Sequence, residues 1–407
     1  MPEVSGRGQN GAKTMARKIL VAGAGIGGLT AAYGLLKAGH DVELFEQAPE
    51  LNEVGAGIQL SANAMHVLNA LGFGDAIASL SVRPGAYVFR LHDTGEVISQ
   101  FPLAQEHEKL HGAPYNQLHR ADLHNLLAAK VQGLKTNVVR LNSRVLDFEE
   151  ADDHVELRLS DGSRVSGDLL IGADGIKSAI RGQVVGADRA SYSGDAAWRI
   201  TVPAEHLPDN FMGQDMSVWM GPGRHAVGYY LRGGALLNFV GLVETSEVSE
   251  ESWTAKFPWE RLKADFDGWH DDIQTVIDKA DRDMCFRWSL YYRPPIEKWS
   301  TRRVTMLGDA VHATLPYLAQ GAAMAIEDGA VLTRALGLTN EVAEALQLYE
   351  RNRIERTSRI VIGSSANRTL FHMSDQAKLR EAFANRDEGS ARNTWLYSYN
   401  PLTVELR

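Results

Sequence analysis

The hydrophobic positions of the chain follow two different periods, and each change of period marks a boundary between expected elements. Short apolar-rich runs at 19–22, 41–45 and 168–172 are bounded by glycine or charged residues, which predicts strands of a largely buried sheet. Between the first two runs, apolar side chains recur at helical spacing, at Leu29, Ala32, Leu35 and Leu36. The folded part of the chain is therefore expected to begin with a strand–helix–strand unit.

The pattern changes in the middle of the chain. Between about 191 and 286, aromatic and polar residues alternate, which indicates an antiparallel sheet inserted into an α/β domain. A strand followed by a helix returns at 303–328, so the first domain is discontinuous. Further short strands are expected at 138–140, 144–149, 155–159 and 164–165, with a turn at Asp161–Gly162, and further helices from 119, at 341–370 and at 375–386.

Three glycines stand where the first strand gives way to the first helix, in the order Gly23-x-Gly25-x-x-Gly28. In such a motif the first glycine makes the tight turn, the second lets the backbone approach a pyrophosphate, and the third lets the helix pack on the strand. The helix N-terminus adds unpaired N–H donors and a favourable dipole. Glu46 ends the second strand at the spacing of a carboxylate that accepts from a ribose, so the motif predicts a dinucleotide site.

Composition excludes several classes of protein. The 407 residues carry a formal net charge of -9 and contain no run of Lys and Arg, which argues against nucleic acid as a partner. The single Cys285 excludes an internal disulfide and a thiolate zinc site. No apolar run reaches membrane-spanning length, so no membrane contact and a cytoplasmic location are expected. The string His107-Glu-Lys-Leu-His111 matches a zinc motif, but Gly112 and Pro114 end the helix, and no metal is expected.

Two further signatures follow the glycine motif. They are Ile171-Gly-Ala-Asp174-Gly175-x-x-Ser178-x-x-Arg181 and Leu307-Gly308-Asp309-Ala310-x-His312-x-x-x-Pro316-x-x-x-Gln320-Gly321. Together with the glycine motif at 23–28, these signatures resemble the single-component FAD-dependent aromatic hydroxylases of the para-hydroxybenzoate hydroxylase type. The resemblance covers roughly residues 17–370. The local sequence is similar to that of the salicylate, 3-hydroxybenzoate and 6-hydroxynicotinate monooxygenase branch at Gly55–Ile58, Trp198–Arg199 and Leu318–Ala322.

This resemblance implies a fold, an activity and a set of cofactor contacts. The expected fold is a Rossmann-like FAD-binding domain with an inserted antiparallel-sheet substrate domain and C-terminal helices. The segments are a disordered leader at 1–16, FAD-binding parts at 17–190 and 287–370, a substrate domain at 191–286 and a helical tail at 371–407. NADH or NADPH is the implied co-substrate. The implied FAD contacts are Gly23, Gly25, Gly28, Glu46, Gly57, Ile58, Arg120, Val145, Asp174, Asp309, Gly321 and Ala322. Asp174 is alternatively a turn former.

On the substrate side, the resemblance implies hydroxylation through a flavin C4a-hydroperoxide, which needs an electron-rich ring and a base at its hydroxyl. His225 and Tyr229 lie four apart on an expected strand, hence on one face, and match the positions used for deprotonation. The resemblance also implies that Pro316 shapes the pocket beside the flavin and that Gln59, Leu315 and Tyr317 contact the substrate. Arg199 and Arg232 are candidates for its carboxylate. Each of these residues has a simpler alternative. His225 could be a surface histidine on a strand, Gln59 could be a polar strand residue, and Arg199 and Arg232 could be surface arginines.

The implied reaction hydroxylates a phenolic or hydroxypyridine-type aromatic carboxylate with O2, salicylate-like substrates being favoured, and loss of carbon dioxide is open. Two alternatives stay open: a flavin oxidase or dehydrogenase without oxygenation, and a protein that retains FAD without turnover. The aromatic tail from Trp395 to Tyr399 could serve a homodimer.

Overall fold

A five-stranded parallel sheet organises one half of the computed structural model, which describes residues 15–51, 57–248, 255–384 and 393–407. Its strand order is β17-β11-β1-β2-β7. Neighbouring strands are in parallel register, with Val21 of β1 opposite Leu44 and Ile171. The strands are β1 (Lys18–Ala22), β2 (Asp41–Phe45), β7 (Val139–Arg140), β11 (Leu169–Gly172) and β17 (Val304–Met306). The predicted strand–helix–strand unit is therefore confirmed, and the predicted leader lies almost wholly outside the described residues.

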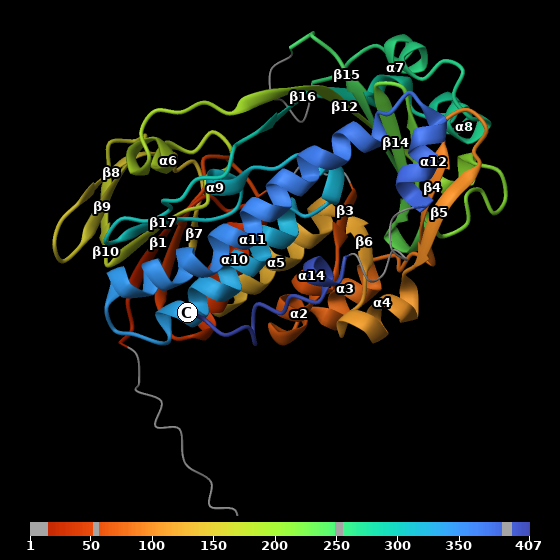
Figure 1. Cartoon of the computed structure of the whole chain (residues 1–407). Helices are drawn as coiled ribbons and strands as arrows, with labels where there is room; N and C mark the ends of the chain where they lie inside the picture. The colour runs from red at the N-terminus through yellow and green to blue at the C-terminus, as the bar shows by residue number, and fades with distance from the viewer. Residues whose placement is uncertain (1–14, 52–56, 249–254, 385–392) are drawn as a thin grey trace, which may run out of the picture.

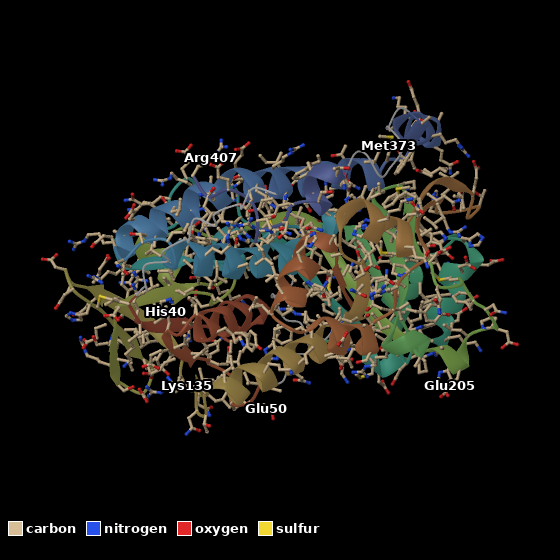
Figure 2. All side chains as sticks on the ribbon, turned by 90° about the horizontal axis from the view of Figure 1, so that it is seen from below. His40, Glu50, Lys135, Glu205, Met373 and Arg407 are labelled. Atoms are coloured by element: carbon tan, nitrogen blue, oxygen red, sulfur yellow. The ribbon has the colours of Figure 1, made fainter. Side chains whose placement is uncertain are left out.

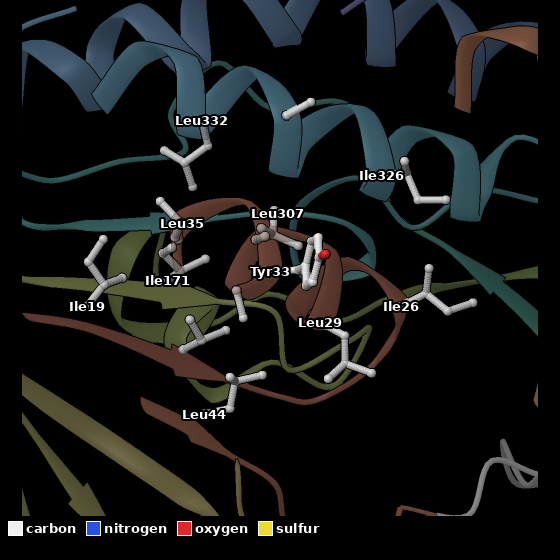
Figure 3. Packing of buried hydrophobic residues seen from close by; sticks show 14 of the residues in the cluster. Ile19, Ile26, Leu29, Tyr33, Leu35, Leu44, Ile171, Leu307, Ile326 and Leu332 are labelled. Atoms are coloured by element: carbon white, nitrogen blue, oxygen red, sulfur yellow. The ribbon is translucent and has the colours of Figure 1, made fainter. Parts of the chain in front are cut away.

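Helices cover this sheet and form the main core with it. Helix α1 (Ile26–Lys37) packs between α5 (Arg120–Leu134) and α10 (Gly321–Leu336), and the longest helix, α11 (Val342–Phe371), lies over α10. Figure 3 shows Leu29 and Leu35 of α1 between the strands and the side chains of Ile326 and Leu332 on α10. The helices approach closely because Gly329 of α10 lies against the Ala31 backbone. A side chain there would separate the two helices.

Smaller elements flank the parallel sheet. A three-stranded antiparallel sheet shares its core, with strands at β8 (Val145–Glu150), β9 (Val155–Leu159) and β10 (Arg164–Gly167). Strands β3 (Gly57–Leu60) and β6 (Asn116–His119) form an antiparallel pair. The remaining helices of this half are α2 (Ala62–Ala70), α3 (Gly74–Leu80), α4 (Ala104–His111), α6 (Ala179–Val184) and α9 (Asp309–His312).

A seven-stranded sheet forms the other end of the molecule, and Figure 1 shows α11 running from the parallel-sheet end to this end. Its order is β16-β12-β15-β14-β13-β4-β5, with strands β4 (Ala86–Leu91), β5 (Val97–Pro102), β12 (Ser191–Pro203), β13 (Met216–Gly221), β14 (Arg224–Leu231), β15 (Leu236–Glu244) and β16 (Phe286–Tyr292). Helices α7 (Trp259–Asp265) and α8 (Asp271–Lys279) share a core with it. Figure 2 places Glu205, after β12, at this end and Lys135, after α5, at the opposite end.

Two features of this sheet were not expected from the sequence. Strands β4 and β5 come from residues 86–102, far upstream of the alternating region, and β13 pairs with β4 in parallel. Strand β16 also continues to Tyr292. The short strands 86–91 and 97–102 carry aromatic side chains on a face that becomes buried only when the later strands join them.

The C-terminal segment packs back onto the body of the protein. After α11 come α12 (Gln376–Ala384) and α14 (Thr394–Tyr397). The aromatic tail lies on α11, where the guanidinium of Arg359 is 3.8 Å from the ring of Trp395 and that of Arg356 is 3.9 Å from the ring of Tyr399. The residues suggested for a dimer thus contact their own chain. None of the helices in the described ranges is long and apolar enough to cross a membrane.

Candidate active site

The three motif glycines occupy positions that differ in the space around them. Gly23 has φ of +102°, and a Cβ there would collide with the carbonyl oxygen of Ala173. A Cβ on Gly28 would collide with the carbonyl oxygen of Gly23. A Cβ on Gly25, in contrast, would meet no atom of the described residues within 4 Å. Gly23 and Gly28 therefore allow the turn to form, while Gly25 leaves its outer face open to a ligand.

A cavity of about 350 Å³ opens beside this turn, between the carboxyl ends of β1, β2 and β11. Six of its lining residues are Gly23, Gly25, Glu46, Val145, Asp174 and Gly175. The Glu46 carboxylate accepts hydrogen bonds from the backbone N–H groups of Ala24 and Ala48, both at 2.9 Å. Its side chain is thus held at the cavity wall where a ribose would lie.

Asp174 has one carboxylate oxygen in a turn and one without a protein partner among the described residues. Its Oδ2 accepts from the backbone N–H of Ala179 at 2.8 Å, so it does stabilise a turn at the start of α6. Its Oδ1 is buried and has no hydrogen-bond partner among the described residues, and burial raises the pKa of this carboxyl. A buried carboxylate oxygen without a partner is costly, which indicates that a ligand donor belongs there.

The third signature forms the turn after β17 and the start of α10. Gly308 has φ of +60° and leads into the short α9, whose first residue Asp309 is exposed. Pro316, also exposed, begins a 3-10 turn, Pro316–Leu318, and Gly321 and Ala322 then begin α10 without a side-chain cap in the described structure. Uncapped N–H groups at the start of a 16-residue helix attract negative charge.

Strand β3 joins the cofactor side to the seven-stranded sheet. The backbone N–H of Gly57 donates to Oδ1 of Asn238 at 3.0 Å, and a Cβ at Gly57 would collide with the Tyr229 ring. Gln59 is 9% exposed, and its Oε1 accepts from the hydroxyl of Tyr115 at 2.6 Å. Burial raises the pKa of the Tyr229 hydroxyl, which keeps its proton at neutral pH. The sequence-predicted residues Gly57, Gln59 and Tyr229 are therefore brought together.

A buried cluster of mainly apolar side chains, referred to below as the chamber, lies under β14. His225 is 2% exposed, and its ring centroid is 5.0 Å from that of Tyr317, which follows Leu315 and Pro316 in the chain. Leu315, Tyr229 and Tyr317 belong to one buried cluster. The hydroxyl of Tyr317 donates to Oδ2 of Asp195 at 2.8 Å. The strand histidine is thus buried beside the predicted substrate residues, in contrast to the alternative of a surface position.

The two arginine candidates differ sharply. Arg199 is 3% exposed, and its guanidinium lies 4.9 Å from the ring of Phe286. Burial and, to a smaller extent, the charge of Arg120 lower the pKa of Arg199 to about 10. Two neighbouring cations, one of them buried, favour an anion between or beside them. Arg232 is half-exposed, and both its Nε and Nη2 donate to Asp122, at 3.0 and 2.9 Å.

Several charged residues near the site, many of them buried, were not identified from the sequence. One group lies behind His225: Asp195, Glu244, Arg368 and His372. Another lies within the helices: Glu327, Asp328, Arg353 and Arg356. A signal did exist for the second group, because Glu327 and Asp328 interrupt an otherwise apolar helix and must therefore be paired when buried. His372 had no such signal, since its role depends on a fold that brings it to β14.

The structure contains two arrangements that resemble metal sites. His107 and His111 lie one turn apart on α4, which ends at Gly112 with φ of +80°. His107 Nε2 accepts from the N–H of Ala62 at 3.3 Å, and Nδ1 of His111 is 2.7 Å from the Ser398 hydroxyl. A second group, Asp195, Glu244 and His372, already contains the guanidinium of Arg368, which binds both carboxylates. In both groups, contacts within the described residues therefore already engage several of the atoms that could bind a cation.

Comparison with known proteins agrees with this geometry. A model of the FAD-binding domain family matches residues 16–364. The 3-hydroxybenzoate 6-hydroxylase 1 of Aquipseudomonas alcaligenes is 39% identical over 346 residues, which cover 85% of this chain and 87% of the relative. The 6-hydroxynicotinate 3-monooxygenase of Pseudomonas fluorescens is 36% identical over 352 residues, covering 84% and 89%. A crystal structure of Klebsiella pneumoniae HpxO with FAD and uric acid has a TM-score of 0.83 and 28% identity, covering 94% and 96%. The chain therefore belongs to the FAD-binding family of aromatic hydroxylases and monooxygenases.

Proposed function

We propose that the protein uses FAD, NAD(P)H and O2 to hydroxylate a phenolic or hydroxypyridine-type aromatic carboxylate. The observation that carries the proposal is the placement of buried His225 and Tyr229 on one face of β14, in one chamber with Leu315 and Tyr317. Cofactor binding alone does not require a buried imidazole and a protonated phenol facing the same apolar space. The named activities of the two relatives, on 3-hydroxybenzoate and 6-hydroxynicotinate, support this substrate class.

The residues of this chain fit FAD. Gly25 leaves room for the pyrophosphate at the start of α1, Glu46 lies where the adenosine ribose is expected, and Val145 and Asp174 line the same cavity. In the third signature, Asp309 faces outward from the turn after β17, and the N-terminus of α10 at Gly321 and Ala322 suits the electron-rich side of a reduced flavin. Ile58 and Arg120 complete the proposed contacts. Bound FAD supplies the activation of O2 for hydroxyl transfer.

The protein residues would act on the substrate in three ways. His225 would accept the proton of the ring hydroxyl, which makes the ring electron-rich. Tyr229 packs on Gly57, and Gln59 lies on the same strand, Gly57–Leu60. These two side chains would orient the substrate hydroxyl by hydrogen bonds. Leu315 and the Tyr317 ring would pack on the ring faces and exclude water, and Pro316 offers a fixed backbone without an N–H donor.

Arg199 would bind the substrate carboxylate. Its guanidinium is buried and has Arg120 as a neighbouring cation, whereas Arg232 is half-exposed and binds Asp122. A reducing, cytoplasmic location and a homodimer belong to the proposal as well. The buried thiol of Cys285, whose pKa burial raises to about 11, is suited to such a compartment, since it is protonated and unreactive.

The test is a panel of aromatic acids that includes salicylate, 3-hydroxybenzoate and 6-hydroxynicotinate. We expect a yellow protein that binds FAD, and NAD(P)H oxidation that one of these acids stimulates, with an oxygen atom from ¹⁸O2 in the product by mass spectrometry. Loss of carbon dioxide would identify hydroxylation at the carboxylate-bearing carbon. Stimulated oxidation that yields only hydrogen peroxide across the panel would contradict the proposal and favour an oxidase.

A further inference from the structure

A hydrogen-bonded chain of side chains runs from His225 to the surface. Nδ1 of His225 lies 2.9 Å from Nε2 of His372, and Nδ1 of His372 lies 3.0 Å from Oε1 of Glu244. The two histidines are 2% and 7% exposed, while the Glu244 side chain is 43% exposed. The three residues come from β14, the end of α11 and the end of β15, so only the folded chain brings them into line.

This arrangement solves a problem that a single buried base would face. Burial, together with the neighbouring His372, holds the pKa of His225 well below its usual value, and burial also lowers the pKa of His372. An imidazole in this environment cannot retain a proton as a cation at neutral pH. If His225 takes the proton of a substrate hydroxyl, it must give up another proton at once. Among the residues that the structure describes, the polar contact of its Nδ1 leads to His372.

We propose that His372 and Glu244 form with His225 a proton relay that carries the substrate hydroxyl proton from the closed chamber to solvent. The inference rests on the proposed hydroxylase function. Nε2 of His225 accepts the substrate proton while Nδ1–H donates its proton to Nε2 of His372. Nδ1–H of His372 then donates to the Glu244 carboxylate, which releases the proton to water. Each imidazole gains one proton and loses one, so both end neutral in the other tautomer and the substrate becomes the anion.

The surrounding groups favour this direction of transfer. Four polar or charged groups from β12, β15, the Pro316–Leu318 turn and α11 face the two histidines: Asp195, Glu244, Tyr317 and Arg368. The guanidinium of Arg368 lies 3.3 Å from the same Glu244 oxygen and also binds Asp195 at 2.6 Å, so its one positive charge offsets part of the charge of the two carboxylates. Asp195 in turn accepts from Tyr317 at 2.8 Å. The apolar ring of Phe371 seals the chamber beside His225.

His372 and Glu244 are therefore positioning and relay residues that act through His225, and the experiment must separate this role from simple packing. The variants are His372→Gln and Glu244→Gln, with Glu244→Asp as the conservative variant and Glu247→Gln as the matched control. Glu247 is another half-exposed carboxylate after β15 and, like Glu244, it binds arginine, namely Arg261 at 3.1 Å and Arg287 at 3.4 Å. Each variant is tested as the FAD-loaded full chain with the panel acid that wild type hydroxylates fastest.

The first measurement is the hydroxylation rate as a function of pH. At pH 7 we expect His372→Gln and Glu244→Gln to be slower by about tenfold or more, because general acid–base transfer of this kind contributes at least that much. The rate should recover as the pH approaches about 10, where a phenol ionises in solution without help. Glu244→Asp should retain most of the wild-type rate at pH 7, and Glu247→Gln should match wild type at every pH.

The second measurement is the ionisation of bound 3-hydroxybenzoate or 6-hydroxynicotinate, followed by difference absorbance in a pH titration. The apparent pKa of the bound hydroxyl should be higher in both relay variants than in wild type, with unchanged FAD affinity. A pH-independent loss of rate, or an unchanged titration of the bound acid, overturns the relay. If His372→Gln does not fold, the half-exposed Glu244→Gln decides alone. A wild-type protein that hydroxylates none of the panel acids overturns the proposed function itself, which distinguishes the two failures.

Discussion

Arg353 on α11 binds Asp328 on α10 with Nε 2.7 Å from Oδ1, and neither side chain has any exposed surface. The other carboxylate oxygen of Asp328 accepts from the Gly308 backbone N–H at 2.9 Å and lies 2.6 Å from Nε2 of His312. Asp328 therefore connects two helices with the turn that presents Asp309 to the proposed flavin. The site depends on a buried ion pair that never touches a ligand.

Replacing Asp328 should destabilise the fold in a pH-dependent way. Burial alone would raise the pKa of Asp328, but His312 and Arg353 outweigh it and lower the pKa from 3.8 to about 2. Because the folded-state pKa is depressed, the stabilisation is present above pH 4 and is lost as the pH falls toward 2. Asp328→Asn should reduce the free energy of unfolding by up to about 3–5 kcal/mol at pH 7, since buried Arg353 keeps only Glu327 as a charge partner and buried His312 loses its carboxylate.

Urea unfolding of wild type and Asp328→Asn at several pH values measures this effect. The difference between the two proteins should shrink by about 2 kcal/mol between pH 5 and pH 2, as linkage requires for such a pKa shift. Asp152→Asn is the control, because the Asp152 side chain is 91% exposed and binds only Arg302 at the surface. A difference that stays constant over this pH range would contradict the assignment of the shift to Asp328.

How much the sequence could predict follows from the range of the interactions involved. The Gly23-x-Gly25-x-x-Gly28 turn, α1, β2 and Glu46 are adjacent in the chain, and local periodicity with glycine sterics was enough to predict their structure. The predicted cofactor residues Val145 and Asp174 line one cavity with them, although their binding role stays a prediction. In contrast, β4 pairs with β13 across more than a hundred residues, and no local pattern encodes that partner. The same holds for His372, which meets His225 only in the tertiary fold.

Two glycine substitutions should separate cofactor binding from folding. Gly25→Ala places its methyl group in open space, so the free energy of unfolding should change by less than about 1 kcal/mol. FAD affinity should nevertheless fall about tenfold or more, which corresponds to at least about 1.4 kcal/mol, because the methyl group obstructs the pyrophosphate. Gly28→Ala, the matched variant, collides with the Gly23 carbonyl and should lower the melting temperature of the apoprotein itself. Equal FAD affinity in Gly25→Ala and wild type would place the pyrophosphate elsewhere.

Replacing His225 should leave the cofactor in place and uncouple the reaction. His225 lies in the chamber under β14, on the seven-stranded sheet, whereas the glycine turn belongs to the parallel sheet. His225→Gln should therefore bind FAD normally and hydroxylate about 10²-fold more slowly at neutral pH, since the substrate keeps its proton. Product formed per NAD(P)H consumed, measured with peroxide release, reports the coupling. Wild-type coupling in this variant would remove His225 from the role of base.

Arg199 is expected to recognise the carboxylate of the substrate, and a comparison of two acids with their decarboxylated analogues tests this. Arg199→Met keeps an apolar side chain against Phe286 and Trp288 but removes the buried charge. The KM for the acid should rise about tenfold to a hundredfold, as expected for a charge-assisted hydrogen bond of about 1.5–3 kcal/mol. The analogue that lacks the carboxylate should bind wild type and Arg199→Met equally.

Arg232→Met is the control, because Arg232 is half-exposed and already bound to Asp122. The KM of this variant should stay within about twofold of the wild-type KM. If Arg199→Met weakens FAD and leaves the KM unchanged, the positive charge beside Arg120 serves the cofactor, and the chamber must hold the carboxylate through other groups.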